Sequence, residues 1–138
     1  MKVWKKVATV FGVLIVGFPL AIAGLFIYAA SDMCGNEIYT EIVSPNKERK
    51  AVVFQRDCGA TTGFSTQISI INSGDRLENE GGNIYIIDGQ PKDVSPPLKW
   101  VSNTELRIER SLNGSEYKAE SSWGLLNKVK VTYGAGGS

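Results

Sequence analysis

The hydrophobic pattern divides this chain into two parts with different periods. Residues 7–30 form a run without a charged residue, and the six residues ahead of it carry three lysines. A helix of that length reaches about 36 Å at ~1.5 Å per residue, enough to cross a bilayer core of roughly 30 Å. Positive charge on a short leading flank favours the cytoplasmic side of a membrane. The pattern therefore predicts a cytoplasmic basic flank at 1–6 and a transmembrane signal-anchor helix at 7–30.

This arrangement predicts a single-pass protein of the bacterial inner (cytoplasmic) membrane that contacts the lipid bilayer through residues 7–30 and holds its C-terminal domain outside the cytoplasm. Cleavage after Ala23 stays open as an alternative, because Ala21-Ile22-Ala23 has the small-x-small pattern of a signal-peptide cleavage site. Gly17 and Ala21 have a spacing that lets two membrane helices approach closely, which would give a homodimer.

After residue 31 the hydrophobic pattern changes to a period of two, which is typical of β-strands. Turn sequences such as 44–47 and Asn113-Gly114 separate the apolar segments. The expected strands are 38–43, 50–56, 64–72, 83–87, 98–100, 105–110, 117–123 and 129–133. We therefore predict an all-β domain at 31–133, a small antiparallel meander of six to eight short strands forming a sandwich or a partly open barrel, with a flexible tail at 134–138. Its expected large core residues are Phe54, Trp100 and Trp123, and the polar stretch 76–82 is expected to be an exposed loop.

Charge and composition exclude several classes of function. The formal net charge is +1, but residues 31–138 hold 12 basic and 14 acidic side chains, so no strongly basic surface is expected and nucleic acid is not a predicted partner. The chain has no histidine, which is the commonest general base and a common metal ligand. We therefore expect a domain that is not an enzyme and holds no cofactor or metal.

The two cysteines, Cys34 and Cys58, both follow the membrane segment. Outside the cytoplasm thiols are normally oxidised, so a Cys34–Cys58 disulfide is expected. It would close a loop of about 25 residues and stabilise the fold by roughly 3–4 kcal/mol in the chain-entropy account. Acylation of Cys34 as a lipoprotein is the alternative, although Asp32 and Met33 stand where that processing requires small residues.

Residues 56–65 (R-D-C-G-A-T-T-G-F-S) form the densest cluster of candidate binding groups. Backbone amides and hydroxyls in such a loop can bind an anion or a carbonyl, with an arginine as a charge clamp. The same residues can equally build a turn that a disulfide holds in place. No base for nucleophilic catalysis stands beside the hydroxyls, so a recognition surface is expected; a Ser/Thr hydrolase using Thr61–Ser65 with a lysine base is the enzymatic alternative. The predicted binding residues are Arg56, Asp57, Thr61, Thr62 and Ser65.

Several of these segments together resemble a known family. The segments are 44–47 (S-P-N-K), 50–54 (K-A-V-V-F), 57–64 (D-C-G-A-T-T-G-F), 98–100 (L-K-W) and 105–108 (E-L-R-I). The chain in this respect resembles uncharacterised bacterial proteins with a single N-terminal membrane segment and a domain of unknown function. The resemblance covers most of 34–133 and implies neither an activity nor a site.

These observations together predict a membrane-anchored, non-catalytic binding domain in the bacterial envelope. Its partner is expected to be another envelope protein or an incoming protein. A small anchored β domain is suited to holding such a partner at a sheet edge or on a loop surface. An immunity or inhibitor protein against an envelope-targeting toxin is one specific version, and a secreted or anchored envelope assembly factor is another.

Overall fold

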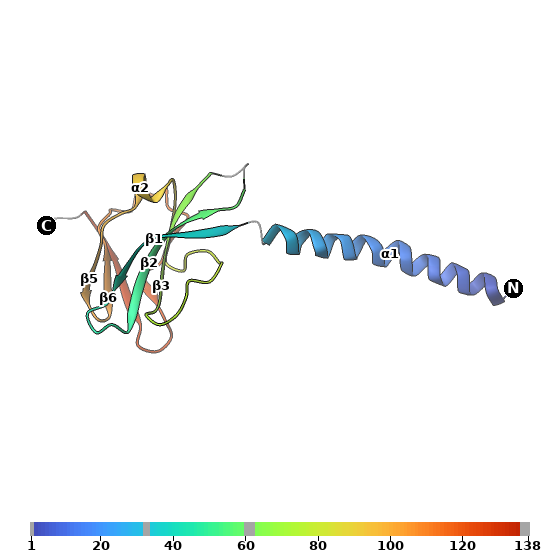
Figure 1. Cartoon of the computed structure of the whole chain (residues 1–138), viewed down its shortest axis with the longest axis horizontal. Helices are drawn as coiled ribbons and strands as arrows, with labels where there is room; N and C mark the ends of the chain where they lie inside the picture. Colours follow the sequence, from blue (N-terminus) through green and yellow to red (C-terminus); the bar gives the residue numbers. More distant parts are fainter. Residues whose placement is uncertain (1, 32–33, 60–62, 136–138) are drawn as a thin grey trace. The chain divides into compact units, whose positions relative to one another are not determined.

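The computed structural model describes residues 2–31, 34–59 and 63–135. The chain forms two compact units, Met1–Cys34 and Gly35–Ser138, which Figure 1 shows as a long helix and a β domain. Each unit is described by itself.

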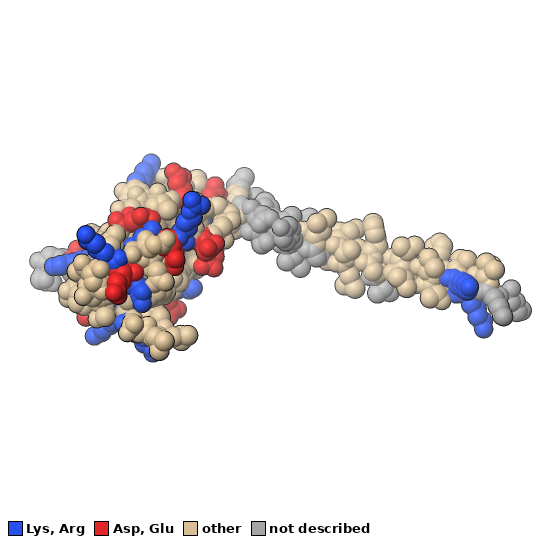
Figure 2. Space-filling view, turned by 60° about the horizontal axis from the view of Figure 1, so that its bottom comes forward, with Lys and Arg blue, Asp and Glu red and all other residues tan. Residues whose placement is uncertain are grey.

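The first unit is helix α1 (Lys2–Ser31). Within it, Val3–Ala23 is a candidate membrane span of 21 residues with a mean hydropathy of 2.1. The basic side chains of α1 lie at its N-terminal end, and the rest of its drawn surface carries no charge (Figure 2). The Thr9 hydroxyl donates to the carbonyl oxygen of Lys5 at 2.9 Å, so this polar group is satisfied within the helix. By length and composition α1 is long and apolar enough to cross a membrane, and an N-terminal signal sequence meets the same criteria.

The second unit contains two β-sheets that share one core. The first sheet is antiparallel, in the order β1-β2-β3-β4-β7, and its strands are β1 (Gly35–Val43), β2 (Arg49–Asp57), β3 (Ser65–Asn72), β4 (Tyr85–Asp88) and β7 (Lys118–Ala119). The second, in the order β5-β6-β9-β8, consists of β5 (Leu98–Ser102), β6 (Glu105–Ile108), β9 (Val129–Tyr133) and β8 (Ser122–Trp123). One short helix, α2 (Pro91–Val94), lies between β4 and β5 along the chain.

The predicted antiparallel meander is therefore correct for β1–β4 and wrong for the second sheet, in which β6 and β9 run parallel. The physical reason lies in the segment 117–123, which was predicted as one strand and divides between the two sheets. Glu120 N–H donates to Ile84 O on the first sheet, while Ser121 O accepts from Val131 N–H on the second. This crossing brings β9 beside β6 in the parallel direction, and the division raises the number of strands among the described residues to nine.

The core contains inward-facing side chains of both sheets. Its buried members are Ala51, Val53, Ile68, Ile70, Ile84, Tyr85, Ile87, Leu106, Ile108, Val129 and Val131. Of the predicted large core residues, Trp100 and Trp123 are only partly buried and pack against this cluster. Phe54 is fully buried, but it alternates with Val53 along β2 and so lies on the opposite, outer face of the first sheet.

The stretch 76–82, predicted as an exposed loop, crosses this outer face. Gly82 N–H donates to Oε1 of Gln67 at 2.6 Å, and the Asn36 amide donates to Glu78 O and Glu80 O. A Cβ at Gly82 would lie 2.9 Å from Ile68 O, so only glycine allows this approach. Most side chains of the loop are exposed, and its backbone packs on the sheet. A polar loop therefore covers apolar side chains, such as Phe54, on the outer face of the first sheet.

Cys34 and Cys58 are disulfide-bonded, as predicted. The bond joins the chain just before β1 to the chain just after β2, next to the paired residues Gly35 and Asp57. It leaves Cys34 without a thiol for acylation, so the lipoprotein alternative is wrong. In the predicted tail, Gly134 N–H still donates to Ile108 O at 3.2 Å, and residues 136–138 lie outside the described chain.

Candidate functional site

The described part of the predicted 56–65 loop uses its polar groups within the fold. Arg56 is half-buried, and its Nη1 donates to Asn36 Oδ1 at 2.8 Å and to Asn79 Oδ1 at 3.2 Å. The guanidinium thereby joins β1, β2 and the loop that crosses the outer face. The Asp57 carboxylate accepts from Gly59 N–H at 3.0 Å, where the chain turns after β2 with a φ of 121° at Gly59.

Ser65 is also committed to internal hydrogen bonds. Its hydroxyl donates to Arg56 O at 3.4 Å and accepts from Gln67 Nε2 at 2.8 Å. Thr61 and Thr62 lie outside the described residues. The structure thus brings Arg56, Asp57 and Ser65 to one end of the β2–β3 hairpin, where each supports the hairpin.

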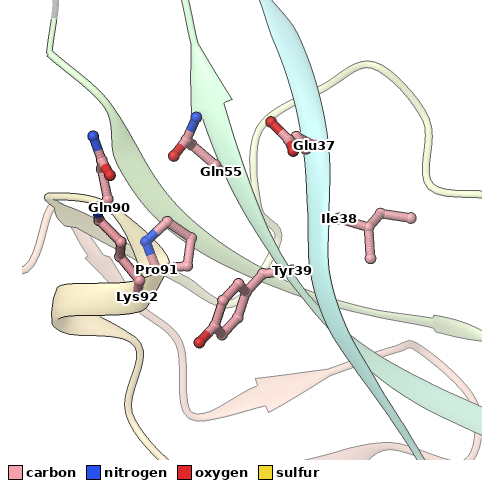
Figure 3. Close-up of a pocket in the computed structure, with 7 residues that line it drawn as sticks. All are labelled: Glu37, Ile38, Tyr39, Gln55, Gln90, Pro91 and Lys92. Carbon is pink, nitrogen blue, oxygen red and sulfur yellow. The ribbon is translucent and has the colours of Figure 1, made fainter.

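A different set of residues surrounds a groove of about 200 Å³ at the same end of the β domain (Figure 3). Its lining residues come from β1, β2 and the start of α2, and they are Glu37, Ile38, Tyr39, Gln55, Gln90, Pro91 and Lys92. The register of β1 against β2 shifts between Ile38 and Thr40, so Tyr39 is the extra residue of a β-bulge. In Figure 3 the Tyr39 ring points toward Lys92, whereas Ile38 points away from α2.

The groove forms where the inner face of β2 leaves the core. Along that face the buried Ala51 and Val53 are followed by the half-buried Gln55, so a polar side chain takes the next inward position. Helix α2 closes this end of the sheet in place of a strand. It is fixed by Gly89, whose N–H donates to Phe64 O and whose carbonyl accepts from the Thr66 hydroxyl, both at 2.9 Å.

The approach to α2 requires glycine at position 89. Gly89 has a φ of +111°, and a Cβ there would lie 2.8 Å from Val94 Cγ1. Pro91 is buried at the first helical position, which suits its fixed φ and missing N–H. The Gly89-Gln90-Pro91 sequence was the one signal in the chain that could have indicated this short helix.

The polar side chains around the groove have no partner among the described residues. The Gln55 and Gln90 amides, the Glu37 carboxylate, the Lys92 amine and the Tyr39 hydroxyl form no hydrogen bond or ion pair to another described group. Gln55 and Gln90 are half-buried, while the other three are exposed. The groove therefore offers several donors and acceptors that the fold does not use.

The groove lies beside an edge of the first sheet, because three of its lining residues belong to β1. This edge is open, since no strand pairs with the far side of β1 in the described chain. Ser44 N–H donates to Arg49 O, so the alternate residues Ile42 and Thr40 also direct their backbone groups to β2. Glu41 and Val43 consequently direct theirs to the open side. Trp100 of β5 contacts β1 next to these residues, because its Nε1 donates to Ile42 O at 2.8 Å. β1 is thus an edge strand in which the backbone groups of Glu41 and Val43 are directed away from β2.

A third polar cluster supports the turn before β7. Arg110 Nη1 donates to the Tyr85 hydroxyl at 2.7 Å, and Arg110 Nη2 lies 3.8 Å from Glu116 Oε1. Burial raises the pKa of Tyr85, against the opposing effect of the Arg110 charge. Burial also acts to raise the pKa of Glu116. The backbone N–H groups that donate hydrogen bonds to its carboxylate and the positive charge of Arg110 act in the opposite direction, and the pKa is lowered overall. All these groups are paired, which indicates a structural role.

No group of three or more Cys, Asp or Glu side chains that could hold a metal ion occurs within residues 2–31, 34–59 and 63–135. No protein-family model, curated protein or solved structure matches this chain. The resemblance to uncharacterised single-pass bacterial proteins therefore stays a prediction, and the site is described from its own geometry.

Proposed function

We propose that this protein is a membrane-anchored, non-catalytic binding module of the bacterial envelope that holds an extended segment of a partner protein at the edge of β1. The observation that carries the proposal is the combination of an open edge strand with an adjacent groove whose polar groups are unused. In strand addition, main-chain hydrogen bonds supply affinity, while pockets beside the edge select the partner's side chains. β1 supplies the first element and the groove supplies the second.

The composition of the site suits an extended polypeptide. Gln55 and Gln90 each carry a donor and an acceptor, as a peptide group does. The Tyr39 ring and Pro91 provide an apolar wall, and Glu37 and Lys92 can pair with a charged side chain of either sign. The bulge at Tyr39 makes indiscriminate pairing of the edge less favourable.

The proposed location rests on α1 and the disulfide. The three lysines before the apolar run favour an N-terminus in the cytoplasm, and the Cys34–Cys58 bond fits an oxidising compartment outside it. We propose the uncleaved anchor, because cleavage after Ala23 would leave an apolar new N-terminus. A homodimer through Gly17 and Ala21 is compatible with this arrangement.

The partner proposed is another envelope protein or an incoming one. An immunity or inhibitor protein, which waits at the membrane for a toxin, is the specific version that we propose to examine first. An envelope assembly factor would use the same edge. A Ser/Thr hydrolase remains the enzymatic alternative, and the bonding of the Ser65 hydroxyl within the β2–β3 hairpin favours the binding module over it.

The proposal can be tested by photo-crosslinking in intact cells. A crosslinking phenylalanine analogue at Tyr39, in the full-length chain, should give an adduct with a discrete protein. The same analogue at Leu112, which is 47% exposed on another loop, is the control and should not.

A pair of variants ties the adduct to strand addition. Glu41→Pro removes a backbone N–H on the open side of β1 and should abolish the adduct, while Glu41→Ala keeps that N–H and should retain it. An adduct that survives Glu41→Pro in a folded protein would contradict binding at the β1 edge.

A further inference from the structure

The turn between β8 and β9 presents the two most exposed large apolar side chains described in the chain. Leu125 is 92% exposed and Leu126 is 85% exposed. Gly124 and Asn127 flank them with φ angles of 95° and 55°, which glycine and asparagine adopt more readily than other residues. The turn therefore places both leucines at its tip, where the rest of the domain leaves their side chains exposed to solvent.

This tip, residues 124–128, lies at the end of the β domain away from the groove. Trp123 pairs with Val129 at the base of the turn, and the Arg49 guanidinium lies 5.2 Å from the centre of the Trp123 ring. Arg49 begins β2, whereas the groove and Gly35 lie near the other end of the β1–β2 hairpin. The two ends of a nine-residue strand are about 30 Å apart at ~3.3 Å per residue.

Two lysines lie close to the leucines of the tip. Lys128 follows the leucines and is exposed, and Lys130 is exposed on β9. The acidic residues nearby are Glu105, in register with Lys130 across the β6–β9 pair, and Glu48, which precedes Arg49 at the base of the turn. Two leucines ahead of lysines form the chemistry that binds the boundary between anionic headgroups and acyl chains.

We propose that the 124–128 tip inserts into the interface of an anionic lipid bilayer and gives the β domain a second membrane contact besides α1. The inference rests on the proposed membrane anchor. The two leucines are almost fully exposed, and the polar residues Ser122, just before the tip, and Asn127, within it, are also exposed. A stable protein interface buries about 800 Å² on each partner, which two leucines in a polar rim do not supply.

The anchor makes this weak contact effective. A chain held in the bilayer by α1 keeps the tip at a high local concentration near lipid, so a two-leucine insertion need not bind on its own.

The test uses the full-length chain in nanodiscs of phosphatidylcholine and phosphatidylglycerol, with ¹³C-labelled leucine methyl groups. Lipid carrying a nitroxide on the upper acyl chain broadens methyl signals that lie near it. We expect the Leu125 and Leu126 signals to lose intensity about fivefold or more, while Leu112 of the β domain stays nearly unchanged. Lys128→Glu should reduce this loss to below about twofold, and the exposed Lys99→Glu on β5 should not.

The outcomes separate the two proposals. If Leu14 and Leu20 of α1 are broadened but Leu125 and Leu126 behave like Leu112, the tip does not enter lipid and the inference is overturned. If the α1 signals are also unaffected, the proposed anchor fails and the inference fails with it. Broadening that persists in Lys128→Glu and in phosphatidylcholine alone would overturn the anionic-lipid requirement.

Discussion

The 56–65 loop and the groove between β1 and α2 are both polar, but their side chains are used differently. Arg56 and Ser65 are bonded to groups of the β2–β3 hairpin and its covering loop. Gln55, next to Arg56 in the chain, points to the opposite face and meets no partner among the described residues. Of these two adjacent residues of β2, Arg56 therefore belongs to a structural hydrogen-bond network and Gln55 to the candidate site.

The described members of the dense polar run, Arg56, Asp57 and Ser65, form hydrogen bonds within the fold, and the recognition role of the 56–65 loop stays a prediction. Residues close in sequence can satisfy one another through turns, and a buried polar group that finds a partner stabilises the fold. In this domain the unused groups lie where segments distant in sequence meet at the end of a sheet. The candidate site is such a place, because it joins residues 37–39, Gln55 and residues 90–92.

The largest effect on stability is expected from removing the Cys34–Cys58 disulfide, which lies at the start of the 56–65 loop. Cys58→Ser should lower the free energy of unfolding by about 2–4 kcal/mol, because the unfolded chain regains the freedom that the disulfide removes. Denaturant unfolding of the full chain in detergent measures it. The double variant Cys34→Ser/Cys58→Ser should be no less stable than Cys58→Ser, and a further loss would mean that Cys34 has another structural role.

Arg56 gives the sharpest test of the loop as structure. Arg56→Ala should lower stability by about 1–3 kcal/mol, since it leaves Asn36 and Asn79 without the guanidinium donor that joins them. The exposed Arg76→Ala is the matched control and should change stability by less than about 0.5 kcal/mol. Loss of the Tyr39 crosslink in Arg56→Ala with unchanged stability would instead restore Arg56 as a binding clamp.

The division of the chain and most strand positions could be predicted from the sequence, because each depends on local hydrophobic period. Strands β1 to β6 and β9 all fall within or close to the expected segments. The parallel pairing of β6 with β9 could not be predicted. It depends on the point at which the chain crosses between sheets at Glu120-Ser121, and nothing in the alternation of 117–123 marks that point.

The candidate site was less predictable than the fold. Gln55 follows a run of apolar residues in β2, so the sequence did not indicate a polar side chain on the inner face of that strand. The position of Tyr39 depends on a β-bulge, and the sequence there contains no glycine that would indicate one. Disulfide pairing followed directly from two cysteines in one compartment. Contacts between distant segments decide which polar side chains remain unpaired, and a single sequence does not specify those contacts.

Acid should reveal the contribution of the paired Glu116 carboxylate to stability. The lowered pKa of Glu116 means that its contribution to stability is present above the unfolded-state value of about 4.3 and is lost as the pH falls through the folded-state pKa. Glu116→Gln should therefore be less stable than the wild-type protein near neutral pH. Its stability should fall less than that of the wild-type protein as the pH drops below about 4.3. Thermal unfolding of the wild-type protein and of Glu116→Gln over this pH range measures the difference. Parallel pH profiles for the two proteins would contradict the assigned role of Glu116.

The smallest effect on stability is expected in the groove itself. Gln55→Ala removes an amide that has no described partner, so the free energy of unfolding should change by less than about 0.5 kcal/mol. The Tyr39 crosslink should nevertheless weaken, because the amide is available to a docked segment. Ser65→Ala, on the other side of the comparison, should lower stability by about 1 kcal/mol through its lost hydrogen bonds and leave the crosslink of the folded protein intact. If Gln55→Ala destabilises the domain while Ser65→Ala weakens the crosslink, the two regions have exchanged roles and the partner binds at the 56–65 loop.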